Sequence, residues 1–214
     1  SGIGADDKDK EGLIAFKGMI VNDPFGALDN WKSDLVSTET YWYLSHHDDK
    51  RVKNVNLGRM DLTGQLVGDL GKLSKLEHLL LNHNNLSGPI PHEFGDLTSL
   101  LDLNLYNNIL HGPIPDSLGK LSKLRYLRLH NNQLTGSIQN LTSLRDLLVL
   151  DLSNNKLSGP IPTALFSLQK LRYLNLSNNG FSGTVPTNKI EFLDLSNNPD
   201  VCGQITKEIY KSCP

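Results

Sequence analysis

Leucines recur along most of this chain at a nearly fixed interval, separated by polar residues. The pattern L-x-x-L-x-L-x-x-N occurs six times between Leu76 and Asn198, and a weaker first copy begins at Val52. A unit of this length cannot bury its own leucines and must stack on its neighbours. The pattern therefore predicts a solenoid with a continuous leucine core. The seven copies begin at positions 52, 76, 100, 124, 147, 171 and 190.

The alternation of leucines within each copy predicts a short strand. Consecutive side chains of a strand point to opposite faces, so the leucines face the core and the residues between them face solvent. Strands repeated at this period should form a parallel sheet on the concave side of a right-handed superhelix, which is an α/β solenoid. The expected strands contain the apolar pairs 55–57, 79–81, 103–105, 127–129, 150–152, 174–176 and 193–195.

An asparagine closes each strand, where the backbone turns inward. Its amide both donates and accepts, so a stacked ladder of these side chains can satisfy the inward peptide groups. Met60 holds this place in the first copy and can do neither, which marks that copy as a boundary repeat. The ladder is predicted at Asn84, Asn108, Asn132, Asn155, Asn179 and Asn198.

A second motif, L-x-G-x-I-P, follows most of these asparagines. Glycine permits a tight turn, and proline favours extended backbone that cannot continue into a helix. The convex side should therefore carry short extended segments followed by helical turns such as 117–121, and the sixth copy should lack its turn. Residues 52–198 resemble the plant-specific class of leucine-rich repeats through this motif. It occurs at 86–91, 110–115 and 157–162, with variants at 134–139 and 181–186.

Both ends of the repeat array are expected to be capped, because a solenoid otherwise exposes its core there. Leu13, Phe16 and Ile20 fall on one helical face, and residues 22–24 (Asn-Asp-Pro) should end that helix. The charged run 6–10 is expected to be a solvated lead-in. The flanking segments resemble the caps of plant receptor-like kinases. The predicted division is lead-in and N-terminal cap at 1–51, seven leucine-rich repeats at 52–198, and C-terminal cap at 199–214.

The two cysteines, Cys202 and Cys213, share the C-terminal segment, and we expect them to be disulfide bonded. The caps of plant receptor-like kinases normally also hold a cysteine pair that brackets a tryptophan. Residues 40–49 stand in that place here and contain no cysteine. The N-terminal cap is therefore expected to hold by packing alone.

Composition and sequons bear on the location of the chain. A net charge of −2 over 214 residues gives no electrostatic case for nucleic acid or an anionic membrane as partner. No apolar run is long enough to span a bilayer. Together with the cysteines and the resemblance, three glycosylation sequons indicate an extracellular protein, either secreted or a cell-surface ectodomain. The sequon asparagines are Asn85, Asn140 and Asn175.

Two motifs resemble a metal site and a phosphate-binding loop, but neither predicts such a site. Residues 46–49 (His-His-Asp-Asp) are adjacent on an extended chain, where neighbouring side chains point apart and rarely share an ion. The stretch 71–74 (Gly-Lys-Leu-Ser) recurs at 119–122, at the repeat period, and therefore belongs to the scaffold. We expect no enzymatic activity, cofactor or metal.

The exposed positions between the leucines are the remaining candidates for function. Aromatic residues and arginine dominate binding hot spots, and both gather on the predicted concave sheet. Exposed tyrosines are also common on ordinary sheets, where they stabilise cross-strand contacts, so a structural role stays open. The candidates are Tyr106, Tyr126, Arg128, His130 and Tyr173, with Arg125 and Arg172 at the margin.

Residues 103–108, 112–129 and 134–138 most resemble ectodomains of somatic embryogenesis receptor kinases, the short plant co-receptors. In that family, cap aromatics and exposed strand residues of the first repeats dock against a receptor and its ligand. The resemblance implies this role for Tyr106, Tyr126 and Arg128, and more loosely for Trp42 and Tyr43.

The predicted function is recognition of an extracellular protein or peptide, with a larger leucine-rich repeat receptor as one such partner. The chain would then be the ectodomain of a receptor-like kinase or co-receptor. Two alternatives stay open. One is a secreted inhibitor of a microbial cell-wall-degrading enzyme, and the other is a structural or ice-binding solenoid, for which regular threonine or serine ladders are expected.

Overall fold

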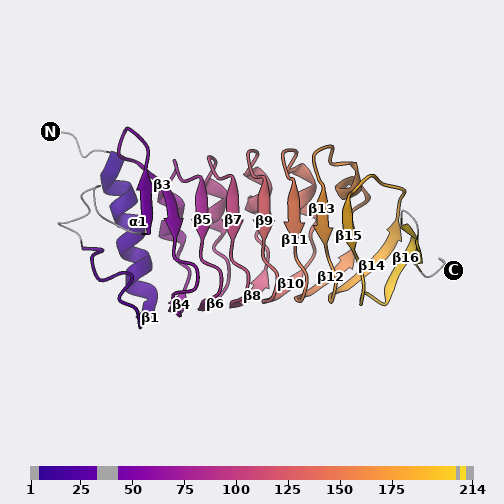
Figure 1. Cartoon of the computed structure of the whole chain (residues 1–214), viewed down its shortest axis with the longest axis horizontal. Coiled ribbons are helices and arrows are strands. Elements are labelled where there is room, and N and C mark those ends of the chain that lie inside the picture. Colours follow the sequence, from indigo (N-terminus) through magenta and orange to yellow (C-terminus); the bar gives the residue numbers. More distant parts are fainter. Residues whose placement is uncertain (1–4, 33–42, 206–207, 211–214) are drawn as a thin grey trace.

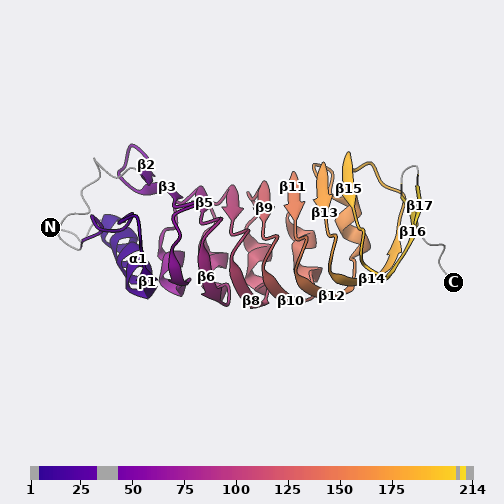
Figure 2. The ribbon, with the colours of Figure 1, turned by 60° about the horizontal axis from the view of Figure 1, so that its bottom comes forward.

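The chain forms an elongated solenoid in the computed structural model, which describes residues 5–32, 43–205 and 208–210 (Figure 1). Two long sheets run side by side along it, one of eight strands and one of nine. Helix α1 (Ala5–Met19) lies across the N-terminal end (Figure 2). None of the helices in the described ranges is long and apolar enough to cross a membrane.

The eight-stranded sheet carries the leucine pattern. Seven of its strands are parallel and pair in register one repeat apart, so that Leu103 lies beside Leu127. The predicted parallel sheet is thus confirmed, although each strand ends one residue before the last leucine of its pair. The strands are β3 (Val52–Asn56), β5 (His78–Leu80), β7 (Asp102–Asn104), β9 (Tyr126–Arg128), β11 (Val149–Asp151), β13 (Tyr173–Asn175) and β15 (Phe192–Asp194), with β2 (Leu44–His46) antiparallel to β3.

The asparagine ladder forms as predicted. The Asn84 amide nitrogen donates to the carbonyl oxygens of Leu57 (2.9 Å) and Leu81 (3.0 Å), and its oxygen accepts from the N–H of Leu62 (3.0 Å). The same oxygen accepts from Met60 N–H (3.2 Å), so the next repeat satisfies the boundary copy. Equivalent bonds recur at Asn108, Asn132, Asn155, Asn179 and Asn198.

The extended segments after the ladder pair into the second sheet, and five short 3₁₀-helices follow them. Residues 186–191 contain no helix, as expected for the sixth copy. Gly112 has φ +80°, which requires glycine at this turn. The strands are β4 (Thr63–Gln65), β6 (Asn85–Gly88), β8 (Ile109–Pro113), β10 (Gln133–Gly136), β12 (Lys156–Pro160) and β14 (Gly180–Val185). The helices are η1 (Gly68–Lys72), η2 (His92–Asp96), η3 (Asp116–Lys120), η4 (Gln139–Ser143) and η5 (Thr163–Ser167).

The N-terminal helix is shorter at its end than the sequence predicted. Leu13 and Phe16 are buried as expected, but α1 ends at Met19 and Ile20 begins strand β1 (Ile20–Asn22). The reason is that β1 pairs antiparallel with β4 and becomes an edge of the nine-stranded sheet, which places Ile20 beside Gly64. The prediction that Ile20 shares the helical face was therefore wrong.

Asp9 is buried rather than solvated, which corrects the expectation for the charged run. Its side chain accepts hydrogen bonds from Arg51 Nε (2.9 Å) and Nη2 (2.8 Å) and from the N–H of Val52 (2.9 Å). Arg51 Nη2 also donates to Ser74 Oγ (3.1 Å). The cap is thus not held by packing alone, because a buried ion pair joins α1 to the first repeats.

At the C-terminal end a hairpin extends the nine-stranded sheet. Strand β16 (Asp200–Ile205) lies parallel to β14, and β17 (Glu208–Tyr210) is antiparallel to β16. Cys202 lies on β16, whereas Cys213 lies outside the described residues. Their disulfide bond stays a prediction.

Candidate binding surface on the concave sheet

Four of the predicted residues lie together on β7, β9 and the turns that follow them. The strand register places Tyr126 beside Asp102, and Arg128 beside Asn104. Tyr106 and His130 follow these strands and stack on each other, with ring centroids 4.3 Å apart and planes 9° from parallel. We call Tyr106, Tyr126, Arg128 and His130 the concave patch.

His83 extends this patch, although sequence reasoning did not select it. Its ring meets Tyr106 edge-on, with centroids 5.3 Å apart at 79°. His83 has φ +54°, at a position where the later repeats carry asparagine. Ring nitrogens of His83 lie 3.1 Å from Arg59 Nη2 and 2.9 Å from Asn107 Nδ2. The replacement of that repeated asparagine by histidine was the sequence signal available.

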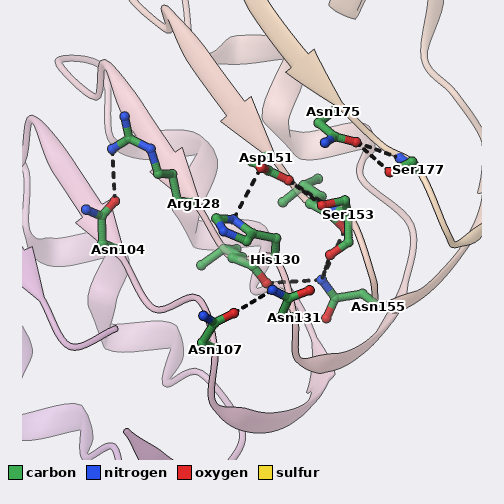
Figure 3. Close-up of polar contacts among 12 residues, drawn as sticks. Asn104, Asn107, Arg128, His130, Asn131, Asp151, Ser153, Asn155, Asn175 and Ser177 are labelled. Carbon is green, nitrogen blue, oxygen red and sulfur yellow. Dashed lines mark hydrogen bonds and ion pairs between the residues drawn. The ribbon is translucent and has the colours of Figure 1, made fainter. Parts of the chain in front are cut away.

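Arg128 is held by contacts with three side chains. Its guanidinium lies over the Tyr126 ring, 5.1 Å from the centroid, in a cation–π arrangement. Nη1 donates to Asn104 Oδ1 (3.2 Å; Figure 3). The same atom lies 3.7 Å from Asp102 Oδ1. The cation is therefore oriented by its neighbours, and its side chain is 30% exposed.

Asp102 supplies the negative charge of this region. Its Oδ1 atom is buried and accepts no hydrogen bond within the described part of the chain, while Oδ2 lies 3.7 Å from His78 Nδ1. Burial raises the pKa of Asp102, and the nearby Arg128 and His78 act in the opposite direction. Buried acceptors without a donor are uncommon in folded proteins, and within the described ranges Trp31 Nε1, Asn54 Oδ1 and His130 Nδ1 are the other buried side-chain atoms without a partner.

His130 faces a second carboxylate on the neighbouring strand. Its Nδ1 atom lies 3.4 Å from Asp151 Oδ2, outside hydrogen-bond geometry (Figure 3). Burial lowers the pKa of His130, Asp151 opposes this, and the positive charge of Arg128 reinforces it. The imidazole is therefore biased toward its neutral form.

Ser153, Asp151 and His130 are the residue types of a catalytic triad, but they are not connected in the order that a triad requires. Ser153 Oγ donates to Asp151 Oδ1 (2.7 Å) rather than to the imidazole, so His130 is not placed as the base for this hydroxyl. Ser153 and Ser177 are only 4% exposed. The expectation that the positions beside the leucines project into solvent was wrong at Asp151, Ser153 and Ser177. Asp151 is 8% exposed, and the hydroxyls of both serines turn back onto their own strands.

Tyr173 and Arg172 form a separate group further along the sheet. Tyr173 stacks on Phe192, with centroids 4.3 Å apart, and Arg172 Nε lies 3.4 Å from Glu191 Oε1. Strand β11, which carries Val149, separates this group from Tyr126 on β9. The candidates thus form two clusters rather than one, and Arg125 is exposed at the margin of the first.

Of the two cap aromatics, Tyr43 lies within the described residues and is less accessible than the resemblance implied. Tyr43 is half-buried and packs against the core, and its carbonyl oxygen accepts from Asn56 N–H (2.8 Å). Trp42 lies outside the described residues.

Among the sequons, Asn85 and Asn140 are exposed, whereas Asn175 is half-buried and its oxygen accepts from Ser177.

These features define a leucine-rich repeat solenoid with a polar, aromatic concave surface. A family model described as a leucine-rich repeat region matches residues 49–194, which is more than half of the chain. The chain therefore belongs to the leucine-rich repeat family. Leucine-rich repeat protein 1 of Oryza sativa subsp. indica is 44% identical over 61 residues, which are 28% of this chain and 29% of that protein.

Solved structures of plant receptors are similar over most of this chain. PEPR1–AtPEP1 has a TM-score of 0.82 at 29% identity, covering 92% of this chain and 31% of that one. The BIR2 ectodomain from Arabidopsis thaliana has a TM-score of 0.71 at 34% identity, covering 82% and 94%. The Arabidopsis receptor kinase HAESA, in complex with the peptide hormone IDA and the co-receptor SERK1, has a TM-score of 0.77 at 28% identity, covering 94% and 35%. The resemblance to plant receptor ectodomains is confirmed.

Proposed function

We propose that this chain is an extracellular recognition module that binds a protein or peptide on its concave patch without catalysis. The observation that carries the proposal is the patch itself, in which two tyrosines, an arginine and a histidine lie on β9 and in the turns after β7 and β9. Beside them, Asp102 keeps a buried oxygen without a hydrogen-bond donor. Aromatic and arginine side chains supply most of the energy at protein interfaces.

The similarity to receptor ectodomains supports the setting. HAESA was solved in complex with a peptide hormone and a co-receptor, and this chain is similar to it over 94% of its own length. We therefore propose the ectodomain of a receptor-like kinase or co-receptor, located outside the cell. The cap aromatics Trp42 and Tyr43 remain a secondary contact in this proposal, and glycosylation at Asn85, Asn140 and Asn175 accompanies it.

The alternatives differ in what they require of the surface. Ice binding needs a regular row of exposed hydroxyls, but the hydroxyls of Ser153, Ser177 and Ser196 donate to side chains two residues earlier. A secreted inhibitor of a microbial wall-degrading enzyme would be built from the same repeat. The identity of the captured partner separates that alternative from a receptor.

The test is capture from extracellular extract with the wild type and with the double variant Tyr126→Ala/Arg128→Ala. We expect the variant to weaken partner binding by at least ~2 kcal/mol, in the range of hot-spot residues. The matched control is Lys120→Ala/Lys123→Ala, whose side chains are exposed away from the concave sheet. Full affinity in the patch variant, or an equal loss in the control, would move the interface elsewhere.

A further inference from the structure

We propose that the open edge of strand β15 is a second interaction surface, which binds an extended basic segment of a partner protein as an added strand of the concave sheet. Strand β15 is the last strand of the eight-stranded sheet and pairs on one side with β13. Unpaired backbone groups at such an edge are a template for another strand.

Two rows of backbone N–H donors run along the solenoid, each donating to the next repeat. In both rows the donor of the seventh repeat has no such acceptor within the described ranges. In six repeats the last leucine of the strand pattern donates to the next repeat, from Leu57 N–H to Leu80 O (2.8 Å) through to Leu176 N–H to Asp194 O (2.9 Å). The seventh leucine in this row is Leu195. It has no following repeat, and its N–H meets no backbone carbonyl among residues 5–32, 43–205 and 208–210.

The second row consists of the residues with positive φ at the turn after each strand. It begins with Arg59 N–H donating to Asn82 O (2.9 Å) and ends with Asn178 N–H donating to Ser196 O (2.9 Å). Asn197 is the seventh member, with φ +57°, and within the described ranges its N–H likewise meets no carbonyl. The N–H groups of Leu195 and Asn197 thus face the position that the strand of a following repeat would occupy.

The C-terminal hairpin does not take up these donors. Strand β16 pairs with β14 and β17, so the hairpin extends the nine-stranded sheet instead of the concave one. Figure 1 shows β15 and β16 as separate strands whose sheets diverge at this end.

Side chains at the same edge favour an apolar residue in the added strand. The register aligns Tyr126, Val149, Tyr173 and Phe192 in one column across four strands. Phe192 ends this column and is 45% exposed. An added strand would place a side chain about 4.8 Å beyond Phe192, as Phe192 lies beyond Tyr173. An aliphatic or aromatic residue there would continue the stack.

Charge distinguishes a basic segment from a second copy of this chain. Glu191 and Asp200 are exposed and Asp194 is half-buried at this end, against the exposed cation Lys189. Glu191 forms an ion pair with Arg172, but the Glu191 side chain is still 74% exposed. Pairing two copies through β15 would bring these carboxylates together, which is unfavourable, whereas lysine or arginine flanking an apolar residue complements them.

The experiment uses the full chain and the synthetic peptide acetyl-Lys-Lys-Val-Phe-Val-Lys-Lys-amide, with residue-resolved amide exchange as the readout. In the free protein, the amides of Leu195 and Asn197 should exchange about tenfold or more faster than those of Leu176 and Asn178, because neither donates to a carbonyl within the described ranges. The peptide should slow the first pair. Phe192→Ala should weaken peptide binding about tenfold. The control is Phe25→Ala, an exposed phenylalanine in the N-terminal cap, which should change nothing.

Four results would overturn the proposal. Slow exchange of Leu195 and Asn197 at every protein concentration would mean that the chain covers its own edge. Slow exchange that develops with protein concentration would make the occupant a second copy. Equal binding of the peptide with glutamate in place of lysine would remove the charge selection, and absence of peptide protection would remove the site. The concave patch is not probed here, so its role stands or fails separately.

Discussion

The two halves of the concave sheet share one strand framework but use their exposed positions in different ways. In the C-terminal half, each strand ends in Asp or Asn, and a serine two residues later donates to it. The N-terminal half has no such closed pairs at β7 and β9, and its polar groups reach across strands instead. The C-terminal pairs are Ser153 with Asp151 (2.7 Å), Ser177 with Asn175 (2.7 Å) and Ser196 with Asp194 (2.6 Å).

The cause is a single position in each repeat. Two residues after Asn104 the chain has Tyr106, and two residues after Arg128 it has His130, so the serine hydroxyl that closes the local pair in the other half is missing here. Asn104 therefore accepts from Arg128 on the next strand, and the aromatic rings stack on each other above the turns. Repeats that satisfy themselves leave little for a partner, whereas repeats that depend on their neighbours keep groups available.

The largest expected effect tests whether the halves share one core. Leu127 is fully buried in β9, close to the boundary between them. Leu127→Ala should lower the free energy of unfolding by about 2 to 5 kcal/mol, because it leaves a cavity. Urea unfolding followed by circular dichroism measures the loss, and limited proteolysis shows where the chain opens. Cleavage confined to one half would show that the halves unfold independently.

The next effect concerns the end of the C-terminal half. A bond between Cys202 and Cys213 would stabilise this end by roughly 2 to 3 kcal/mol, mainly by restricting the unfolded chain. Reduction should loosen β16 and β17 while the middle repeats stay folded, because repeats stabilise their neighbours. Amide exchange before and after reduction measures this. Two free thiols by mass spectrometry, in protein made under oxidising conditions, would contradict the pairing.

The strand positions, the ladder and the clustering of the four concave-patch residues could be predicted because each follows from one repeated spacing. Features that depend on contacts outside that spacing could not. Asp9 and Arg51 are 42 positions apart, and nothing in the run 6–10 marks which carboxylate is buried. The extended segments also pair into a second sheet, and no periodic pattern in the sequence marks that pairing. His83 was missed because it lies one position past the strand columns, in the turn.

The serine pairs offer a smaller effect that separates stability from binding. Ser153→Ala removes the hydroxyl from Asp151 Oδ1, which keeps the Ser153 N–H (3.1 Å). We expect a loss of about 1 kcal/mol in the free energy of unfolding, because a carboxylate acceptor is left partly unsatisfied. Partner binding should not change. The matched control is Ser122→Ala, where the serine is exposed. An unchanged free energy of unfolding would mean that the serine hydrogen bonds do not stabilise this half.

The smallest expected effect is the pH dependence contributed by His130 in the N-terminal half. Burial lowers the pKa of His130 below its ordinary 6.5, so the unfolded chain binds this proton more readily than the native state. The sign follows: the stability contributed by neutral His130 is present above pH 6.5 and is lost as the pH falls through the native pKa. His130→Gln should therefore flatten the fall in unfolding free energy between about pH 7.5 and about pH 5.5, where most carboxylates stay ionised. His92→Gln, at an exposed site on η2, serves as the control. Equal slopes of unfolding free energy against pH in the wild type and in His130→Gln would show that the stacked imidazole is as well solvated as a surface histidine.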